Sequence, residues 1–235
     1  MVTHAEIQRV YQKLLSHYGP QGWWPLYNDK TGKIEYHPGD YSFPKNEQQS
    51  FEISVGAILT QNTSWKNVEK ALQQLHKTKS LSREKLKVLP TGKLAKLIKS
   101  SGYHNQKAKK IKEFLKFDKT VTRQALLELW GIGPETADSI LLYVYKQPVF
   151  VVDAYTRKVM SRLGFAFASY DELQQLFMMN VPNDYKIMNE FHALFVEHGK
   201  KICKAKPLCG ACPLKETCNY FKRTRTSLRS VISPL

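Results

Sequence analysis

The chain has 235 residues, of which 42% are hydrophobic, and a formal net charge of +16 at pH 7. This length and composition allow one large or two small domains with an apolar core. No run of 18 apolar residues occurs, which excludes a transmembrane helix and so a membrane partner.

The excess of positive charge favours a polyanionic partner, although a generally basic protein has the same net charge. The basic residues cluster at 107–112 and 222–229, and this clustering favours nucleic acid. Residues 1–6 lack the apolar core of a signal peptide, so we expect a cytoplasmic protein.

Apolar residues at helical spacing dominate the chain. The pattern predicts helices over 7–15, 51–59, 65–75, 94–98, 106–117, 122–129, 154–163, 172–179 and 185–198. Residues 26–50 are rich in turn formers, which predicts a loop with a short hairpin near 33–37. Since no longer strand pattern, repeat or low-complexity segment occurs, the predicted fold is all-α.

The segment that begins Leu129-Trp130-Gly131-Ile132-Gly133-Pro134-Glu135-Thr136 predicts a helix, a tight turn and a second helix. The glycines permit turn conformations that other residues resist. Pro134 suits the first position of a helix, where its missing N–H is not needed. We expect the amides of Gly131, Gly133, Glu135 and Thr136 to point out of the turn and attract a phosphate.

This segment resembles the helix-hairpin-helix and Gly/Pro-Asp region of the DNA glycosylase superfamily of endonuclease III. The family pattern is Leu-Pro-Gly-Val-Gly-x-Lys-Thr-Ala, followed by a lone aspartate after an apolar run. Here Trp130 replaces the proline and Glu135 occupies the lysine position. The 18 positions from Glu135 to Asp153 equal the lysine-to-aspartate distance of the family.

The resemblance covers nearly the whole chain and implies two helical domains flanking a cleft. A six-helix barrel would span 42–147. Residues 1–41 and 148–235 would form the second domain, with the hairpin and Asp153 at the mouth of the cleft.

Four cysteines lie close together near the end of the sequence, in the pattern C-x5-C-x2-C-x5-C. They are Cys203, Cys209, Cys212 and Cys218. Disulfides are not expected in an intracellular protein, and the spacing alone suits tetrahedral zinc and a [4Fe–4S] cluster equally.

The residues around the cysteines look like the iron–sulfur tail of endonuclease III, although the first spacing of the family is usually one residue longer. The resemblance implies a [4Fe–4S] cluster. The cluster would hold the loop that carries Lys204 and Lys206 against DNA phosphates.

Removal of a damaged base passes through a positively charged, oxocarbenium-like sugar that an anion can stabilise. Asp153 follows an apolar run and precedes a helix, whose N-terminus would help to keep it ionised. By position alone Asp153 is an ordinary N-cap residue. The hairpin at the family distance favours the catalytic interpretation.

Bifunctional members of the superfamily use a lysine amine that attacks the sugar and forms a Schiff base. A carboxylate cannot form an imine, so Glu135 predicts a monofunctional glycosylase that leaves an abasic site. Glu135 is otherwise interpreted as a solvated glutamate favoured by the helix dipole. Lys146 and Lys158 are alternative amines, but neither matches the motif position.

Without a strong nucleophile, the departing base must leave easily, as a cationic alkylated purine does. Aromatic faces bind such a base, and Trp23, Trp24 and Trp65 are the candidates. These residues resemble the Trp-Trp-Pro and Leu-Thr-Gln-Asn-Thr-x-aromatic motifs of endonuclease III-like 3-methyladenine glycosylases. We expect Trp23 and Trp65 to sandwich the base. The alternative is that the tryptophans belong to the core, which Trp24 fits best.

A base in a duplex must be flipped out before excision, and side chains fill the gap. By resemblance, Gln61 would fill it and Tyr103 would intrude opposite, while the alternatives are a helix-cap glutamine and a surface tyrosine. Glu52 is nine residues before Gln61, which is the wrong place for the glutamate of adenine mismatch glycosylases, so its expected role is structural.

The sequence thus predicts a monofunctional DNA glycosylase that excises an alkylated purine such as 3-methyladenine from double-stranded DNA. We expect a monomer associated with the nucleoid. The alternatives are a thymine or uracil mismatch glycosylase, a bifunctional glycosylase and lyase of endonuclease III type, and a non-catalytic iron–sulfur DNA-binding protein.

Overall fold

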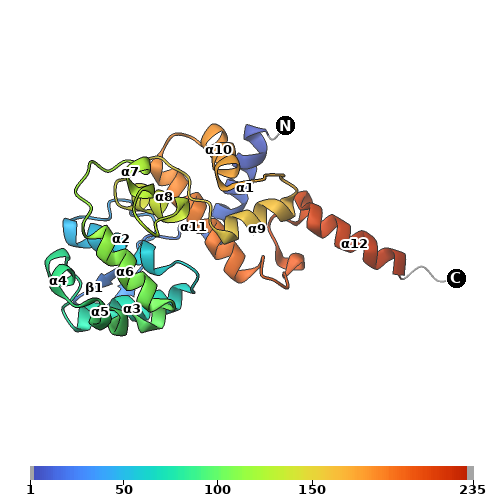
Figure 1. Cartoon of the computed structure of the whole chain (residues 1–235). Coiled ribbons are helices and arrows are strands. Elements are labelled where there is room, and N and C mark those ends of the chain that lie inside the picture. Colours follow the sequence, from blue (N-terminus) through green and yellow to red (C-terminus); the bar gives the residue numbers. More distant parts are fainter. Residues whose placement is uncertain (1–2, 232–235) are drawn as a thin grey trace. The chain divides into compact units, whose positions relative to one another are not determined.

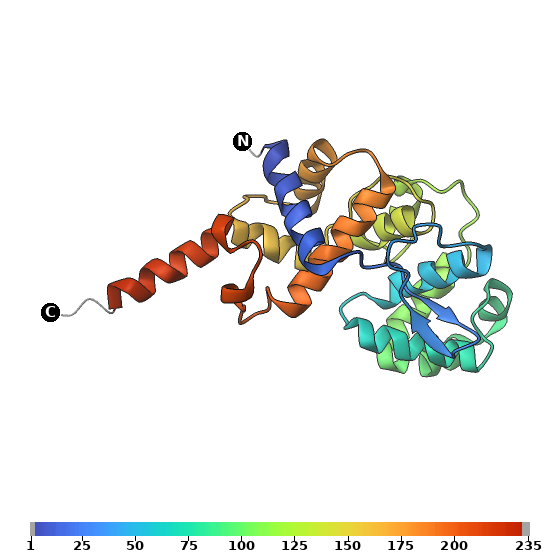
Figure 2. The ribbon, with the colours of Figure 1, turned by 180° about the vertical axis from the view of Figure 1, so that it is seen from behind.

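The computed structural model describes residues 3–231, with side chains up to Arg225. The chain divides into two compact units, Met1–Gln21 with Pro148–Leu235 (unit 1) and Gly22–Gln147 (unit 2). Both units consist mainly of helices, as Figures 1 and 2 show, which confirms the predicted all-α class. None of the described helices combines the length and the hydrophobicity needed to cross a membrane.

Unit 2 contains a small antiparallel hairpin and the helices of the central sequence. Its elements are β1 (Leu26–Asn28), β2 (Lys33–Glu35), α2 (Glu47–Leu59), α3 (Trp65–Lys77), α4 (Arg83–Val88), α5 (Thr91–Leu97), η1 (Lys99–Ser101), α6 (His104–Phe114), α7 (Arg123–Leu127) and α8 (Pro134–Tyr143). Helix α4 was not predicted from the sequence because its six residues are mostly charged and bury only Leu86.

The central helix of unit 2 is α2, in which every residue from Phe51 to Leu59 is buried. A helix that is apolar on all sides must be covered on all sides. Helices α3, α6 and α8 pack against α2 and provide that cover.

The β1/β2 hairpin belongs to unit 2, although the predicted boundary at 41/42 assigned it to the other domain. The reason is the buried carboxylate of Glu52 on α2. It accepts a hydrogen bond from the Tyr27 amide on β1 at 2.8 Å and lies 2.9 Å from His76 Nε2 on α3. These contacts attach the N-terminal loop to α2 and α3. They also give Glu52 the structural role that was expected.

Unit 1 contains the first helix, the helices after residue 148 and the cysteine-containing segment. Its elements are α1 (His4–Tyr18), α9 (Ala154–Leu163), α10 (Tyr170–Asn180), α11 (Tyr185–Lys201), η2 (Cys209–Ala211), η3 (Lys215–Thr217) and α12 (Asn219–Val231). α9 has the predicted bounds. α12 was interpreted only as a basic cluster because its charges obscure any apolar face.

The core of unit 1 is aromatic. Phe150 stacks on Phe177 of α10 with 3.8 Å between ring centroids, and Phe191 stacks on Phe195 of α11 at 4.8 Å. The N-terminal segment joins this unit because the buried Glu190 of α11 accepts a hydrogen bond from the Gln21 amide at 2.8 Å.

Candidate active site

The predicted hairpin is present in unit 2, between α7 and α8. Gly131 has φ +82°, a left-handed conformation that favours glycine, whereas Gly133 is extended and caps α8. A Cβ added to Gly133 would meet nothing within 4 Å, so the backbone is open to a close approach. Pro134 occupies the first turn of α8, where amides have no partner within the helix.

Gln61 holds this turn in place. Its Nε2 donates to the carbonyl of Gly131 at 3.0 Å and to Thr136 Oγ1 at 2.9 Å, while its Oε1 accepts from Lys110 Nζ at 2.6 Å. A wedge between DNA bases requires a side chain that is free to extend. In this structure the amide of Gln61 is engaged within unit 2, and its expected role as a wedge stays a prediction.

The same contacts limit what Thr136 can offer to a phosphate. Its side chain is buried and its hydroxyl accepts the Gln61 hydrogen bond. The backbone N–H of Thr136, in the first turn of α8, remains available to an anion.

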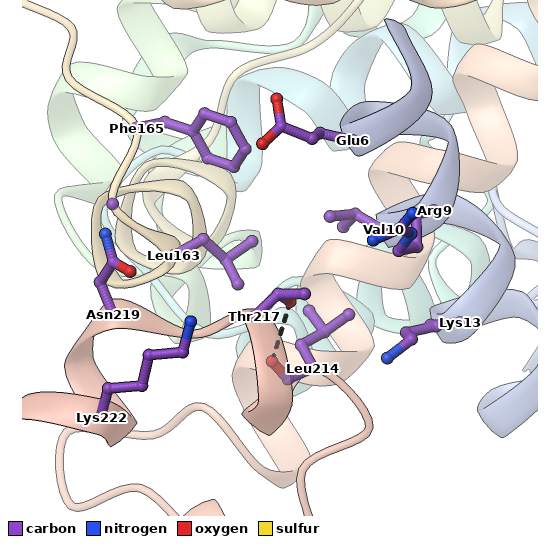
Figure 3. Close-up of a pocket in the computed structure, with 11 residues that line it drawn as sticks. Glu6, Arg9, Val10, Lys13, Leu163, Phe165, Leu214, Thr217, Asn219 and Lys222 are labelled. Atoms are coloured by element: carbon purple, nitrogen blue, oxygen red, sulfur yellow. Dashed lines mark hydrogen bonds between the residues drawn. The ribbon is translucent and has the colours of Figure 1, made fainter. Parts of the chain in front are cut away.

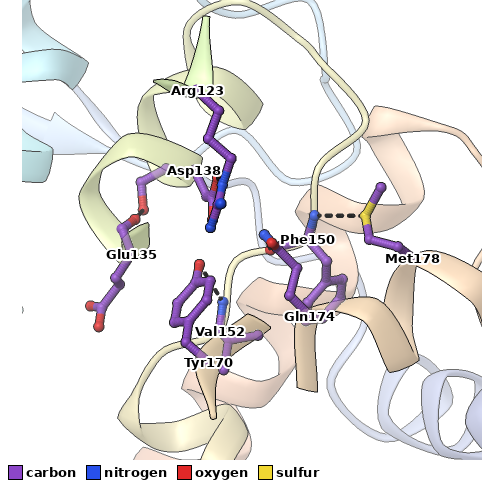
Figure 4. Close-up of polar contacts among 9 residues, drawn as sticks. Arg123, Glu135, Asp138, Phe150, Val152, Tyr170, Gln174 and Met178 are labelled. Carbon is purple, nitrogen blue, oxygen red and sulfur yellow. Dashed lines mark hydrogen bonds and ion pairs between the residues drawn. The ribbon is translucent and has the colours of Figure 1, made fainter. Parts of the chain in front are cut away.

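An ion pair joins the two helices of the hairpin, as Figure 4 shows. Arg123 of α7 donates from Nε to Asp138 Oδ1 at 2.8 Å and from Nη2 to Oδ2 at 3.1 Å, and the carboxylate of Asp138 is fully buried. Two parallel N–H···O bonds fix the relative orientation of the helices.

Glu135, at the lysine position of the family motif, is exposed in the first turn of α8. Its carboxylate points away from the Arg123–Asp138 pair in Figure 4. The placement agrees with a glutamate favoured by the helix dipole, and the functional prediction for Glu135 stays a prediction.

Trp23, Trp24 and Trp65 form one aromatic cluster in unit 2. The ring centroids of Trp23 and Trp65 are 5.1 Å apart at 54°. A base between two parallel rings requires about 7 Å, which is two stacking distances. The two indoles contact each other directly and leave less space than a sandwiched base requires, and the expected sandwich stays a prediction.

The three tryptophans differ in exposure. Trp24 and Trp65 are buried, and Trp24 also packs edge-on against Tyr143 with 5.2 Å between centroids. The burial of Trp24 agrees with the alternative that it is a packing residue. Trp23 is half-buried and keeps part of its surface accessible. The indole N–H groups of Trp24 and Trp65 are buried and have no acceptor among the described residues.

Tyr103 is the N-cap residue of α6 and is 66% exposed. Its backbone is left-handed, with φ 44°, and it follows Gly102, which has φ 68°. Positive φ is uncommon for a residue with a side chain. An exposed ring on such a backbone is compatible with the predicted intruding role.

In unit 1, Asp153 is the N-cap of α9. Its Oδ1 accepts from the Thr156 amide at 2.7 Å, and its Oδ2 lies 3.8 Å from His192 Nε2 of α11. Burial alone would raise the pKa of Asp153, but His192 and the Thr156 hydrogen bonds outweigh burial and hold the pKa below its usual range. The carboxylate is therefore ionised at neutral pH.

The segment before Asp153 is fixed by side chains of α10, also shown in Figure 4. The Val152 amide donates to Tyr170 Oη at 3.3 Å, and Gln174 Nε2 donates to the Phe150 carbonyl at 2.7 Å. These bonds give the carboxylate a defined position within unit 1.

The four cysteines, Cys203, Cys209, Cys212 and Cys218, lie on one segment of unit 1 and are free thiols. Burial, and then the proximity of the other thiols, raises the pKa of Cys209, and both effects also raise that of Cys212 to about 11. No three acidic, histidine or cysteine side chains in the described part of the chain converge closely enough to hold a metal ion.

Arg162 at the end of α9 binds the cysteine segment. It donates to Cys203 Sγ at 3.2 Å, to the Lys204 carbonyl at 2.6 Å and to the Ala205 carbonyl at 3.1 Å. The side chains of Lys204 and Lys206 are exposed. Four cysteines are a donor set that suits an iron–sulfur cluster, and the guanidinium beside Cys203 would balance part of the thiolate charge.

Three residues that position these sites were not predicted from the sequence, namely Lys110, Arg162 and His192. Each acts through a partner far away in the sequence, and no local pattern marks such a pair. For Arg162, the only available signal is its place in the last turn of α9.

The chain is similar in sequence to known DNA repair proteins. Residues 55–183 match the model of the HhH-GPD superfamily of base excision DNA repair proteins. A provisionally named DNA repair glycosylase of Methanocaldococcus jannaschii is 41% identical over 90% of this chain and 95% of its own. Endonuclease III of Thermotoga maritima is 31% identical over 77% of this chain and 89% of its own.

A solved structure is also similar, that of the H. pylori 3-methyladenine DNA glycosylase bound to 1,N6-ethenoadenine. Its TM-score is 0.67 and its identity 28%, with 85% of this chain and 98% of that chain covered. The chain described here belongs to the HhH-GPD superfamily and is a base-excision DNA glycosylase.

Proposed function

We propose that this glycosylase is monofunctional and excises alkylated purines such as 3-methyladenine from double-stranded DNA, acting as a monomer. The observation that carries the proposal is the exposed carboxylate of Glu135, where bifunctional relatives have an amine. A carboxylate cannot attack the sugar to form a Schiff base. Excision then depends on a base that leaves readily.

Asp153 supplies the chemistry in this proposal. As the bond from the sugar to the base breaks, positive charge develops on the sugar, and a nearby fixed anion stabilises that charge. The lowered pKa of Asp153 supports this role because the carboxylate is ionised without assistance from substrate. Water then completes the hydrolysis and leaves an abasic site.

For base recognition we propose the aromatic cluster, with Trp23 in contact with the base and Trp65 behind it. Trp23 is the member with more accessible surface. Stacking contributes on the order of 1–3 kcal/mol per base, and a cationic base gains more on an aromatic face.

The cysteine segment is proposed to hold a [4Fe–4S] cluster through Cys203, Cys209, Cys212 and Cys218. When bound, the cluster cross-links this segment. Arg162 anchors the adjacent loop on α9, so Lys204 and Lys206 present their charges from a fixed backbone.

The decisive experiment is to incubate the protein with methylated DNA and to separate the released bases by chromatography. We expect 3-methyladenine among the products. Asp153→Asn should slow release at least a hundredfold and retain DNA affinity. The matched control is Asp184→Asn, since Asp184 also caps a helix of unit 1. Equal release by wild type and Asp153→Asn would overturn the assignment.

A second candidate function is the glycosylase and lyase activity of an endonuclease III, which the relative of that name favours. Borohydride trapping separates the two. We expect no covalent adduct with wild type, and an adduct with Glu135→Lys. The Glu135→Gln variant, which has no amine, is the control. A wild-type adduct would contradict the monofunctional proposal.

A further inference from the structure

The last helix, α12, is strongly basic and takes no part in the site proposed above. It contains Lys222, Arg223, Arg225 and Arg229 and no acidic residue. The side chains of Lys222, Arg223 and Arg225 are exposed. Both Figure 1 and Figure 2 show the later turns of α12 running away from α9 and the cysteine segment.

The first turn of α12 is fixed to the body of unit 1. The guanidinium of Arg162 lies 4.9 Å from the centre of the Tyr220 ring. Asn219 packs directly on Gly164, where an added Cβ would collide with its side chain. The first turn of α12, which carries the first of these positive charges, is therefore fixed against α9.

A cavity of about 320 Å³ opens where α12 begins and α1 passes, and its walls include the cations Arg9, Lys13 and Lys222. Figure 3 shows Lys13 from α1 and Lys222 from α12 extending toward the cavity from opposite sides. The lining has one carboxylate, that of Glu6, whose Oε2 is engaged by the Thr3 amide and hydroxyl at 2.9 Å each. The cavity thus carries an excess of positive charge.

We infer that this surface, made by Arg9 and Lys13 of α1 and the cations of α12, is an additional binding site for the DNA phosphate backbone. One phosphate occupies the cavity between the two helices. The exposed Arg223 and Arg225 neutralise further phosphates of the same duplex. The inference rests on the proposed action on double-stranded DNA.

The dimensions of α12 fit a strand better than a single small anion. From Lys222 to Arg225 the helix rises about 4.5 Å. Successive phosphates of one strand are separated by about 3.4 Å along the duplex axis, so Arg225 lies about one phosphate further along than Lys222. A single small anion would bind in the cavity, which Arg223 and Arg225 do not line.

The test measures the affinity for an undamaged duplex by fluorescence anisotropy over a range of salt concentrations. Each lost phosphate contact flattens the slope of log K against log salt by about 0.9. We expect the triple variant Arg9→Gln/Lys13→Gln/Lys222→Gln to flatten the slope by about 1, because its three cations share the one phosphate of the cavity. Arg223→Gln/Arg225→Gln should flatten it by about 2.

The matched control is Lys30→Gln/Lys33→Gln/Lys186→Gln, which removes the same charge from other exposed positions. Its slope should stay close to that of wild type. A second variant, Arg9→Lys/Arg223→Lys/Arg225→Lys, keeps the charges and should retain the wild-type slope. This separates loss of charge from loss of folding.

The inference is overturned if the α1 and α12 variants keep the wild-type slope, or if the control variant flattens it equally. Binding of undamaged DNA does not depend on base release. A protein that fails to release 3-methyladenine but shows the expected slopes would contradict only the proposed function.

Discussion

The hairpin of unit 2 and the cysteine segment of unit 1 are held in place in different ways. Side chains of the protein itself, Gln61, Lys110 and the Arg123–Asp138 pair, fix the hairpin at hydrogen-bond distances of 2.6–3.1 Å. The cysteine segment has Arg162 on one side and four free thiols. The first region is preorganised by the chain alone, whereas the second is the proposed site of a bound cluster.

The largest expected effect comes from removing a thiol from the cysteine segment. Cys203→Ser should lower the bound iron and the unfolding free energy of unit 1 by several kcal/mol, because cluster binding contributes to folding. Iron analysis and limited proteolysis check this, with Ala211→Ser as the control in the same segment. Wild-type iron content in Cys203→Ser would contradict the proposed ligands.

The next effect concerns the ion pair between the hairpin helices. Asp138→Asn should lower the stability of unit 2 by about 2–3 kcal/mol, since the carboxylate is fully buried but Arg123 can recover some hydration. Urea denaturation measures the change. Glu128→Gln is the control, because it breaks the exposed pair with Lys119 and should have no resolvable effect. Equal losses in both variants would show that burial of the pair is unimportant.

A smaller effect distinguishes a structural role of Gln61 in the hairpin from a role as a wedge between DNA bases. Gln61→Ala should reduce the amide protection of residues 131–136 in hydrogen exchange and cost about 1 kcal/mol. The exposed Gln74 provides the control variant Gln74→Ala. If Gln61 were only a wedge, the hairpin amides would stay protected, and affinity would fall for damaged DNA alone.

The smallest effect is a pH dependence at Lys107, which is 1% exposed. Its Nζ donates to the carbonyls of Leu59 at 2.8 Å and Ser101 at 2.6 Å. Burial, together with Lys110, lowers the pKa of Lys107 to about 8. Between pH 8 and 10.5 the unfolded chain binds more protons at this residue than the folded chain, so its contribution to stability rises with pH.

Lys107→Met should therefore lose stability relative to wild type as the pH increases from 8 to 10.5, on the order of 1 kcal/mol. Paired denaturation curves at both pH values check the sign. Lys109→Met is the exposed control. If the stability difference between Lys107→Met and wild type did not change with pH, burial would not lower the pKa of Lys107.

Local sequence patterns were sufficient to predict much of the fold. Hydrophobic periodicity predicted the bounds of α9, and the glycines and Pro134 predicted the hairpin, because both features depend on neighbouring residues. The N-cap geometry of Asp153 also follows from its place before a helix. The resemblance to the superfamily added its expected role.

Long-range contacts could not be predicted in the same way. The hydrogen bonds of Gln61 to Gly131 and Thr136 join residues 70 and 75 positions apart. The direct contact of Trp23 with Trp65 depends on how the N-terminal loop packs on unit 2. Glu52 and His76 fix that packing through Tyr27 and so move the domain boundary.

The division of the chain has a consequence for its synthesis. Unit 2 is a continuous insertion, Gly22–Gln147, within unit 1. On the ribosome, α1 emerges before unit 2 but lacks its partner α11 until residue 201 has been made. Unit 2 has all its residues available earlier, so we expect it to fold co-translationally before α1 can pack against α11. Helix α1 is thus made before unit 2 and buried after it.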